Sequence, residues 1–150
     1  MKPLSGGEKD KNPPKEIESI PFNGSINFDA TSITVKFDEF IKLNNLNSQL
    51  IVSPIITPKP EILVKGKRLV MKLPKNLTPN TTYSINFGSA ITDITENNVF
   101  PNYKYVFSTG NFIDSLSYSG TVVNAFDLSP QEKVFVHLYE KSNDSIPYKD

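Results

Sequence analysis

The sequence has 150 residues but no cysteine, no tryptophan and only one histidine, His137. Without cysteine, this chain has no disulfide, no thiol nucleophile and no thiolate metal site. It also lacks an excess of either charge, because sixteen basic and sixteen acidic residues cancel. A neutral chain has no overall field that would draw in nucleic acid or an anionic membrane, so we expect no nucleic-acid partner.

Long hydrophobic runs are absent as well. A membrane-spanning helix needs roughly 18 or more apolar residues in a row, and no stretch approaches that length. Residues 1–15 also lack the apolar core of a signal peptide. If the protein acts outside the cytoplasm, we expect that its export signal has been removed and that Met1 stands in its place.

The opening stretch, KPLSGGEKDKNPPKE, mixes glycine, proline and charge, and it has no apolar side chain between Leu4 and Ile17. Such a composition cannot contribute to a packed core, so we predict a flexible tether over residues 1–15.

From Ile17 onward, apolar residues alternate with polar ones in one segment after another, and turn residues bound each segment. A period of two is typical of half-buried strands. Strands are predicted at 16–20, 32–37, 50–53, 82–87 and 103–108, with two more inside 61–73 that meet at Lys65-Gly66. Seven strands with frequent turns predict an all-β fold, an immunoglobulin-like or fibronectin-like antiparallel β-sandwich over 16–110.

A new pattern begins after Gly110. The stretches SLSYSGTVVNAF and KVFVHLYE predict two more strands, separated by the turn-rich DLSPQE. Two strands cannot bury a core alone. Residues 111–150 are therefore predicted to be a partial second β module or a hairpin docked on the first unit.

The stretch LTPNTTY at 77–83 predicts a tyrosine corner. In β-sandwiches of this type, a tyrosine near the start of the sixth strand turns its hydroxyl back to a backbone group a few residues upstream. Leu77 would plug the end of the core, Pro79 would preset the corner, Asn80 would take a left-handed conformation, and Tyr83 would begin the strand. The alternative is an ordinary loop into a strand that begins with tyrosine.

Residues 12–110 resemble a bacterial Ig-like domain of the SbsA type. The motifs that carry the resemblance are Pro13-Pro14, Phe37-Asp38-Glu39, the stretch from Leu77 to Tyr83, the turn from Asp93 to Asn97, and Phe107-Ser108-Thr109-Gly110. The sequence departs from the family at Glu96, where glycine is usual.

Two further resemblances concern the context of this domain. The stretch PLSGGEKDKNPP is similar to the segment after the lipidated cysteine of surface lipoproteins from Gram-negative bacteria. This resemblance implies an extracytoplasmic protein of the periplasm or cell surface, an outer-membrane lipoprotein in its full-length form. Residues 120–140 are similar to the first hairpin of carboxypeptidase-regulatory or transthyretin-like β domains, which are non-catalytic.

One loop has the residue types of a calcium site. The stretch TDITENN places Asp93, Glu96 and Asn97 close together, and their side-chain oxygens are suitable calcium ligands. The spacing is not that of an EF-hand, and the same residues also cap the backbone of tight turns. The two interpretations are a structural turn and a calcium site.

The remaining polar groups predict no catalytic residue. Asp38 and Glu39 end a strand, and the cations at Lys65, Lys67 and Arg68 surround a hairpin tip, where lysine guards against edge pairing. His137 has no nucleophile or metal ligand at a suitable spacing. We therefore expect no enzyme and no cofactor, and a structural, spacing or adhesive module. The alternative is a module that binds a glycan or protein through its loops or a sheet edge.

Overall fold

The computed structural model describes residues 9–115, 119–132, 134 and 136. The described residues form nine strands and one short helix, all within the first of two compact units, Met1–Asp114 and Ser115–Asp150. No helix in this part of the chain is long and apolar enough to cross a membrane.

The first unit contains a four-stranded antiparallel sheet with the strand order β1-β2-β6-β5. Its strands are β1 (Glu16–Ile20), β2 (Ser32–Phe37), β5 (Glu61–Lys65) and β6 (Arg68–Lys72). A tight hairpin joins β5 to β6, and Gly66 supports the turn with a positive φ of 63°. The predicted hairpin at Lys65-Gly66 is therefore confirmed.

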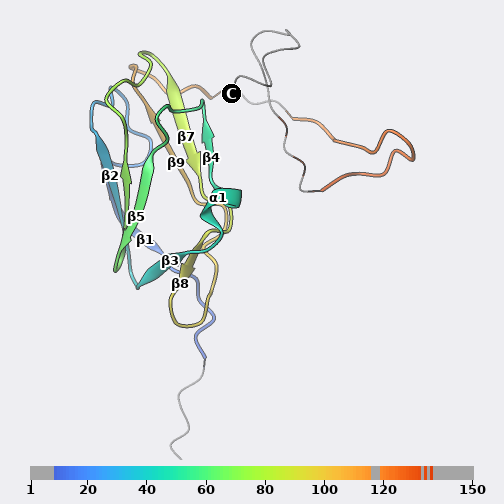
Figure 1. Ribbon diagram of the computed structural model, residues 1–150, viewed down its shortest axis with the longest axis horizontal. Coiled ribbons are helices and arrows are strands. Elements are labelled where there is room, and N and C mark those ends of the chain that lie inside the picture. Colours follow the sequence, from blue (N-terminus) through green and yellow to red (C-terminus); the bar gives the residue numbers. More distant parts are fainter. Residues whose placement is uncertain (1–8, 116–118, 133, 135, 137–150) are drawn as a thin grey trace, which may run out of the picture. The chain divides into compact units, whose positions relative to one another are not determined.

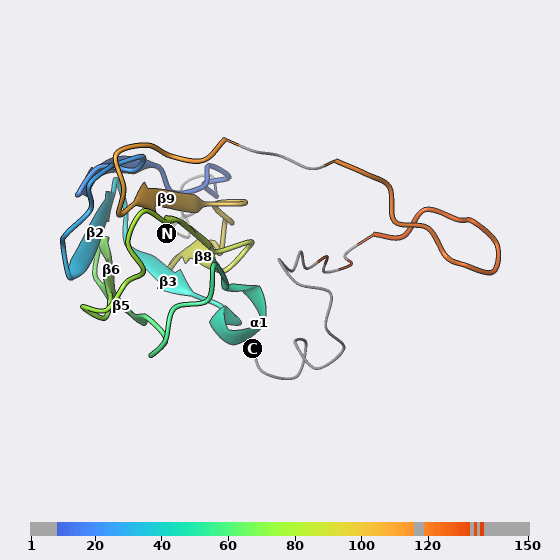
Figure 2. The same cartoon turned by 90° about the horizontal axis from the view of Figure 1, so that it is seen from above.

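A second antiparallel sheet has the order β4-β7-β9. It consists of β4 (Ile51–Ser53), β7 (Thr82–Asn86) and β9 (Lys104–Ser108). The two sheets form the layers of a sandwich (Figure 1), and the view from above separates β2, β6 and β5 from β9 (Figure 2). All seven predicted strands are present, and the all-β Ig-like fold class is confirmed.

The core lies between these sheets, because every second side chain of the central strands points inward. Alternation is clearest in β2, where Ile33, Val35 and Phe37 are completely buried. The facing sheet contributes aromatic rings, and Tyr83 stacks on Phe107 with ring centroids 5.3 Å apart. The buried apolar residues are Phe28, Ile33, Val35, Phe37, Ile41, Ile56, Leu69, Met71, Leu73, Tyr83, Ile85, Phe87, Ala90, Ile91, Tyr103, Tyr105 and Phe107.

Three short elements lie where the sequence predicted neither a strand nor a helix. Strands β3 (Ile41–Leu43) and β8 (Ile91–Asp93) pair with each other, and helix α1 (Leu46–Gln49) precedes β4. All three residues of β8 are buried, so the strand shows no alternation. The helix is one turn long and has no side-chain cap. Neither kind of element has a periodic sequence signal.

Residues 23–28, named here the edge segment, run parallel to β9 along the edge that β7 leaves free. The N–H groups of Gly24, Asn27 and Phe28 donate to the carbonyls of Val106, Gly110 and Ser108. In return, the Ser108 N–H donates to the Ser25 carbonyl at 2.9 Å. The edge segment therefore covers β9, whose backbone groups would otherwise be open to pairing with another chain.

The chain enters and leaves the sandwich at opposite ends (Figure 1). At the entry end, Pro14 is buried. The Lys15 N–H donates to Asp38 Oδ1 at 2.8 Å, and the Asp38 N–H donates to the Lys15 carbonyl at 3.0 Å. At the exit end, the Asp114 N–H donates to Thr82 Oγ1 at 2.9 Å. Residues 1–8 of the predicted tether lie outside the described residues, and the domain boundaries stay predictions.

In the second unit, the described residues form a short hairpin without a full strand. Val123 bridges Pro130, the Asn124 N–H donates to the Ser129 carbonyl, and the Gln131 N–H donates to the Val122 carbonyl. This pairing uses part of DLSPQE, which the sequence predicted to be the turn. The predicted strand KVFVHLYE lies mostly outside the described residues.

Candidate functional site

The tyrosine corner predicted from LTPNTTY is present. Tyr83 is 3% exposed, and its hydroxyl accepts a hydrogen bond from the Thr78 N–H at 2.9 Å. Asn80 takes a left-handed conformation with φ 50°, and Leu77 packs against the core. The hydroxyl thus satisfies a backbone donor in the connection between β6 and β7.

Thr109 ties the corner to the end of β9. Its Oγ1 donates to the Thr78 carbonyl at 2.7 Å and accepts from the Thr81 N–H at 3.0 Å. Gly110 follows, and a Cβ there would lie 3.0 Å from Asn80 Cα. The corner and the Thr109-Gly110 pair therefore form one structural unit, although the sequence analysis treated them as separate motifs.

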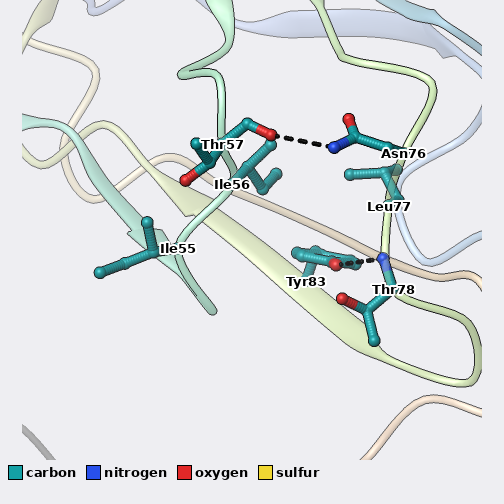
Figure 3. Close-up of a pocket in the computed structure, with 7 residues that line it drawn as sticks. All are labelled: Ile55, Ile56, Thr57, Asn76, Leu77, Thr78 and Tyr83. Atoms are coloured by element: carbon teal, nitrogen blue, oxygen red, sulfur yellow. Dashed lines mark hydrogen bonds between the residues drawn. The ribbon is translucent and has the colours of Figure 1, made fainter. Parts of the chain in front are cut away.

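A hollow of about 220 Å³ lies beside the corner (Figure 3). Asn76 spans its rim, where Nδ2 donates to the Thr57 carbonyl at 3.3 Å. The lining has no carboxylate, histidine or lysine, and the Tyr83 hydroxyl already accepts a backbone hydrogen bond. It therefore lacks the groups for acid–base chemistry. The lining residues are Ile55, Ile56, Thr57, Asn76, Leu77, Thr78 and Tyr83.

A second hollow, of about 470 Å³, lies between loops at the exit end, and Leu77 borders both hollows. Asp29 and Lys75 bring opposite charges to it, and Thr31 and Thr109 bring hydroxyls. Its other lining residues are Phe28, Ala30, Pro74, Leu77 and Pro79.

The calcium candidates lie in a turn that Asp93 organises. Asp93 is 1% exposed, and its Oδ1 accepts hydrogen bonds from the N–H groups of Glu96 at 2.6 Å and Asn97 at 2.8 Å. Its Oδ2 accepts from the Asn98 N–H at 2.9 Å. Asn97, not Glu96, has the positive φ, at 65°, so the turn forms without the usual glycine of the family.

Two opposing effects act on the pKa of Asp93. Burial raises it, but the three backbone N–H donors stabilise the carboxylate more, so the pKa lies below its ordinary value. The structural turn accounts for both carboxylate oxygens. Within the described residues, no three histidine, aspartate or glutamate side chains converge in a way that could hold a metal ion.

At the entry end, Glu39 lies within electrostatic reach of four other carboxylates, those of Asp10, Asp38, Asp93 and Glu96. Burial raises the pKa of Glu39, and the four neighbouring carboxylates raise it further by repulsion. Asp38 is committed to the backbone of Lys15 through its Oδ1. At this strand end, Asp38 therefore stabilises the fold through its backbone hydrogen bond, whereas the negative charge of Glu39 is unfavourable.

The basic hairpin tip is also tied into the fold. Lys67 Nζ donates to the Asp38 carbonyl at 2.6 Å and lies 5.6 Å from the centre of the Phe40 ring. Lys65 and Arg68 pair with each other as the last residues of β5 and the first of β6. His137 lies outside the described residues.

The side chains that attach the edge segment were not predicted from the sequence. Asn23 donates from Nδ2 to the Lys104 carbonyl at 2.9 Å and accepts at Oδ1 from the Val106 N–H at 2.8 Å. Tyr105 donates its hydroxyl to the Pro21 carbonyl at 2.7 Å, and burial raises its pKa to about 12. Their partners lie more than 80 positions away along the chain, so no local pattern indicates them.

These features define an immunoglobulin-like β-sandwich whose interior is filled with side chains. The family model described as bacterial Ig-like domain matches residues 10–109, and the chain belongs to that family. No curated protein matches the chain. Membership indicates a structural or adhesive module of a kind typically found outside the cell or on its surface.

Proposed function

We propose that residues 10–109 are a non-enzymatic spacer or adhesive module of an exported, lipid-anchored cell-envelope protein. The observation that carries the proposal is the position of the two chain ends, which leave the sandwich at opposite ends (Figure 1). A domain connected in this way adds its own length between whatever precedes and whatever follows it. The proposal needs no ligand and no cofactor.

The envelope context rests on the resemblances in the sequence. The opening stretch is similar to the segment after a lipidated cysteine, which favours an outer-membrane lipoprotein. Residues 120–140 favour a second, transthyretin-like β module after the first. Fatty-acid labelling and fractionation of the full-length protein in its native host test this placement. Recovery as an unlipidated soluble protein would contradict the anchor.

A domain-replacement experiment tests the spacing role. Residues 16–110 of the full-length protein would be deleted, or replaced by an unrelated Ig-like sandwich of similar length, with an epitope at the far end of the chain. We expect deletion to reduce antibody access to the epitope on intact cells and replacement to restore it. Restoration by the native sandwich alone would contradict a spacing role.

The second candidate function is binding of a glycan or protein through loops. The hollow with Asp29, Lys75 and two threonine hydroxyls favours it, because sugar hydroxyls pair with such groups. Screening on a glycan array, with Asp29→Ala and Lys75→Ala as matched variants, tests it. Saturable binding that both substitutions weaken would support this function over simple spacing.

We also propose that calcium is not needed for folding. Both carboxylate oxygens of Asp93 already accept backbone hydrogen bonds. The melting temperature in excess calcium is therefore expected to equal that in chelator. A rise with calcium that Asp93→Asn abolishes would assign an ion site to the TDITENN loop instead.

A further inference from the structure

We propose that the pairing of the edge segment with β9 is a mechanical clamp that resists tension along the chain. The inference rests on the proposed function, because a module between an anchor and an exposed part of a protein is pulled through its two ends. The relevant feature is the order of the contacts along the path that the tension would follow.

The direction of pairing decides how the hydrogen bonds would be loaded. The edge segment follows β1 from the entry end, and residues 109–115 follow β9 to the exit end. Ser25 bridges Phe107 in parallel, so tension draws the edge segment toward its N-terminus and β9 toward its C-terminus. The two strands are pulled past each other in shear.

Shear loads all the hydrogen bonds of the pair together. Backbone hydrogen bonds between strands lie across the strand direction, so none of them can open before its neighbours. Four such bonds join the edge segment to β9 and Gly110. An antiparallel hairpin pulled open from its free ends would instead release its bonds one after another.

Side-chain hydrogen bonds strengthen the contact between the edge segment and β9 near residue 23, where the edge segment begins. Asn23 holds both the Lys104 carbonyl and the Val106 N–H, and the Tyr105 hydroxyl holds the Pro21 carbonyl. Asn27 and Phe28 add backbone bonds near the far end, to Gly110 and Ser108. Tension that enters along β1 would act first on the pairing of β1 with β2 and then on the contact between the edge segment and β9.

Single-molecule force measurements on the full chain test the clamp. Because the sequence lacks cysteine, Lys11→Cys and Ser115→Cys provide unique attachment points on either side of the sandwich. The lifetime of the folded sandwich would be recorded at constant force. Loss of the two Asn23 hydrogen bonds in Asn23→Ala is expected to shorten this lifetime roughly tenfold.

Asn44→Ala is the matched control, because Asn44 Nδ2 donates to Thr92 Oγ1 at 2.9 Å in the β3–β8 ladder, outside the proposed path. It is expected to change stability in urea but not the lifetime under force. Equal lifetimes for the two variants would overturn the clamp.

A second pair of variants applies if Asn23→Ala does not fold. Tyr105→Phe removes the hydroxyl bonds to the Pro21 and Phe22 carbonyls. Tyr103→Phe is the control, because the buried Tyr103 hydroxyl, which lies near Glu16, makes no hydrogen bond to the edge segment. Only Tyr105→Phe should shorten the lifetime, and equal lifetimes would overturn the proposal. That outcome would leave the spacing role intact, since epitope access on cells tests it separately.

Discussion

Tyr83 and Asp93 have the same role at opposite ends of the sandwich. Each accepts a hydrogen bond from a backbone N–H in a connection between strands. The role of Tyr83 could be predicted because its partner, Thr78, lies only five positions upstream. For Asp93, the residue types indicated either a turn or an ion site, and only the positions of its two oxygens favour the turn. Asn23 could not be recognised at all, because its partners belong to another strand.

Tyr83→Phe tests the corner. The substitution leaves the Thr78 N–H without its acceptor in a part-buried hydrogen bond, so we expect the free energy of unfolding to fall by about 0.5–1.5 kcal/mol. Urea unfolding measures the change. Tyr103→Phe is the control and should cost less, because the Tyr103 hydroxyl, which lies near Glu16, accepts no backbone hydrogen bond in the described part of the chain. Equal losses in the two variants would show that the hydroxyl of Tyr83 has no special role.

Asp93→Asn tests the turn through its pH dependence. The folded state lowers the pKa of Asp93, so the unfolded chain takes up the proton first as the pH falls. The stabilisation is therefore present above the ordinary aspartate pKa of about 3.9 and is lost below it. Thermal melts from neutral to acidic pH should show a shallower acid-side loss in Asp93→Asn. Parallel curves would contradict the assigned role.

At the scale of elements, the sequence predicted long alternating strands well and short buried ones poorly. Strand β2 has three inward side chains separated by polar ones, which is a clear signal. Strand β8 is buried on both sides and three residues long, so it resembles a loop in sequence. The edge segment pairs through its backbone, and its side chains do not follow polarity, because Ile26 is exposed and Ser25 is buried, so the sequence NGSINF does not reveal the contact.

The carboxylates at the entry end predict a stabilising substitution. Burial and four neighbouring carboxylates raise the pKa of Glu39, so its charged form opposes folding at neutral pH. Glu39→Gln is expected to raise the melting temperature at pH 7. Because the folded state binds this proton more readily, the advantage should shrink as the pH falls through the raised pKa. Glu61→Gln, which removes one partner of an exposed ion pair with Lys72, is the control and should give no such gain.

At the scale of the whole molecule, all the core residues found in the described part of the chain belong to the first unit. The buried apolar side chains lie between Phe28 and Phe107, before the second unit begins. The class of the fold could be predicted because each of the seven predicted strands has a local sequence signal. The contacts that attach the two ends of the first unit could not be predicted, because they join residues far apart in the sequence.

Truncation tests this independence. A chain that ends at Ser115 retains the core and the Asp114 contact with Thr82, so it should melt at the temperature of the sandwich in the full chain. Residues 115–150 alone should give no cooperative transition, because two strands bury too little apolar surface. Calorimetry measures the melting temperature of the shortened chain and of the full chain, and shows whether residues 115–150 unfold cooperatively. A lower melting temperature for the shorter chain would mean that residues 116–150 stabilise the sandwich.

The contact of Asn23 with β9 is also expected to slow the chemical ageing of the protein at this position. Asparagine is a thermolabile residue, and Asn23 is followed by glycine, whose nitrogen can attack the side-chain amide and release ammonia. In the fold, the Gly24 N–H is bound to the Val106 carbonyl and the Asn23 amide is held on both sides, so this attack is blocked. Whenever the edge segment detaches, the reaction becomes available: loss of ammonia leaves a cyclic imide, and water opens this ring to aspartate or isoaspartate. The Lys104 carbonyl, which accepts a hydrogen bond from the Asn23 amide in the fold, would then face a carboxylate. The fraction of deamidated protein, read by mass spectrometry, would therefore record how long this edge has been open.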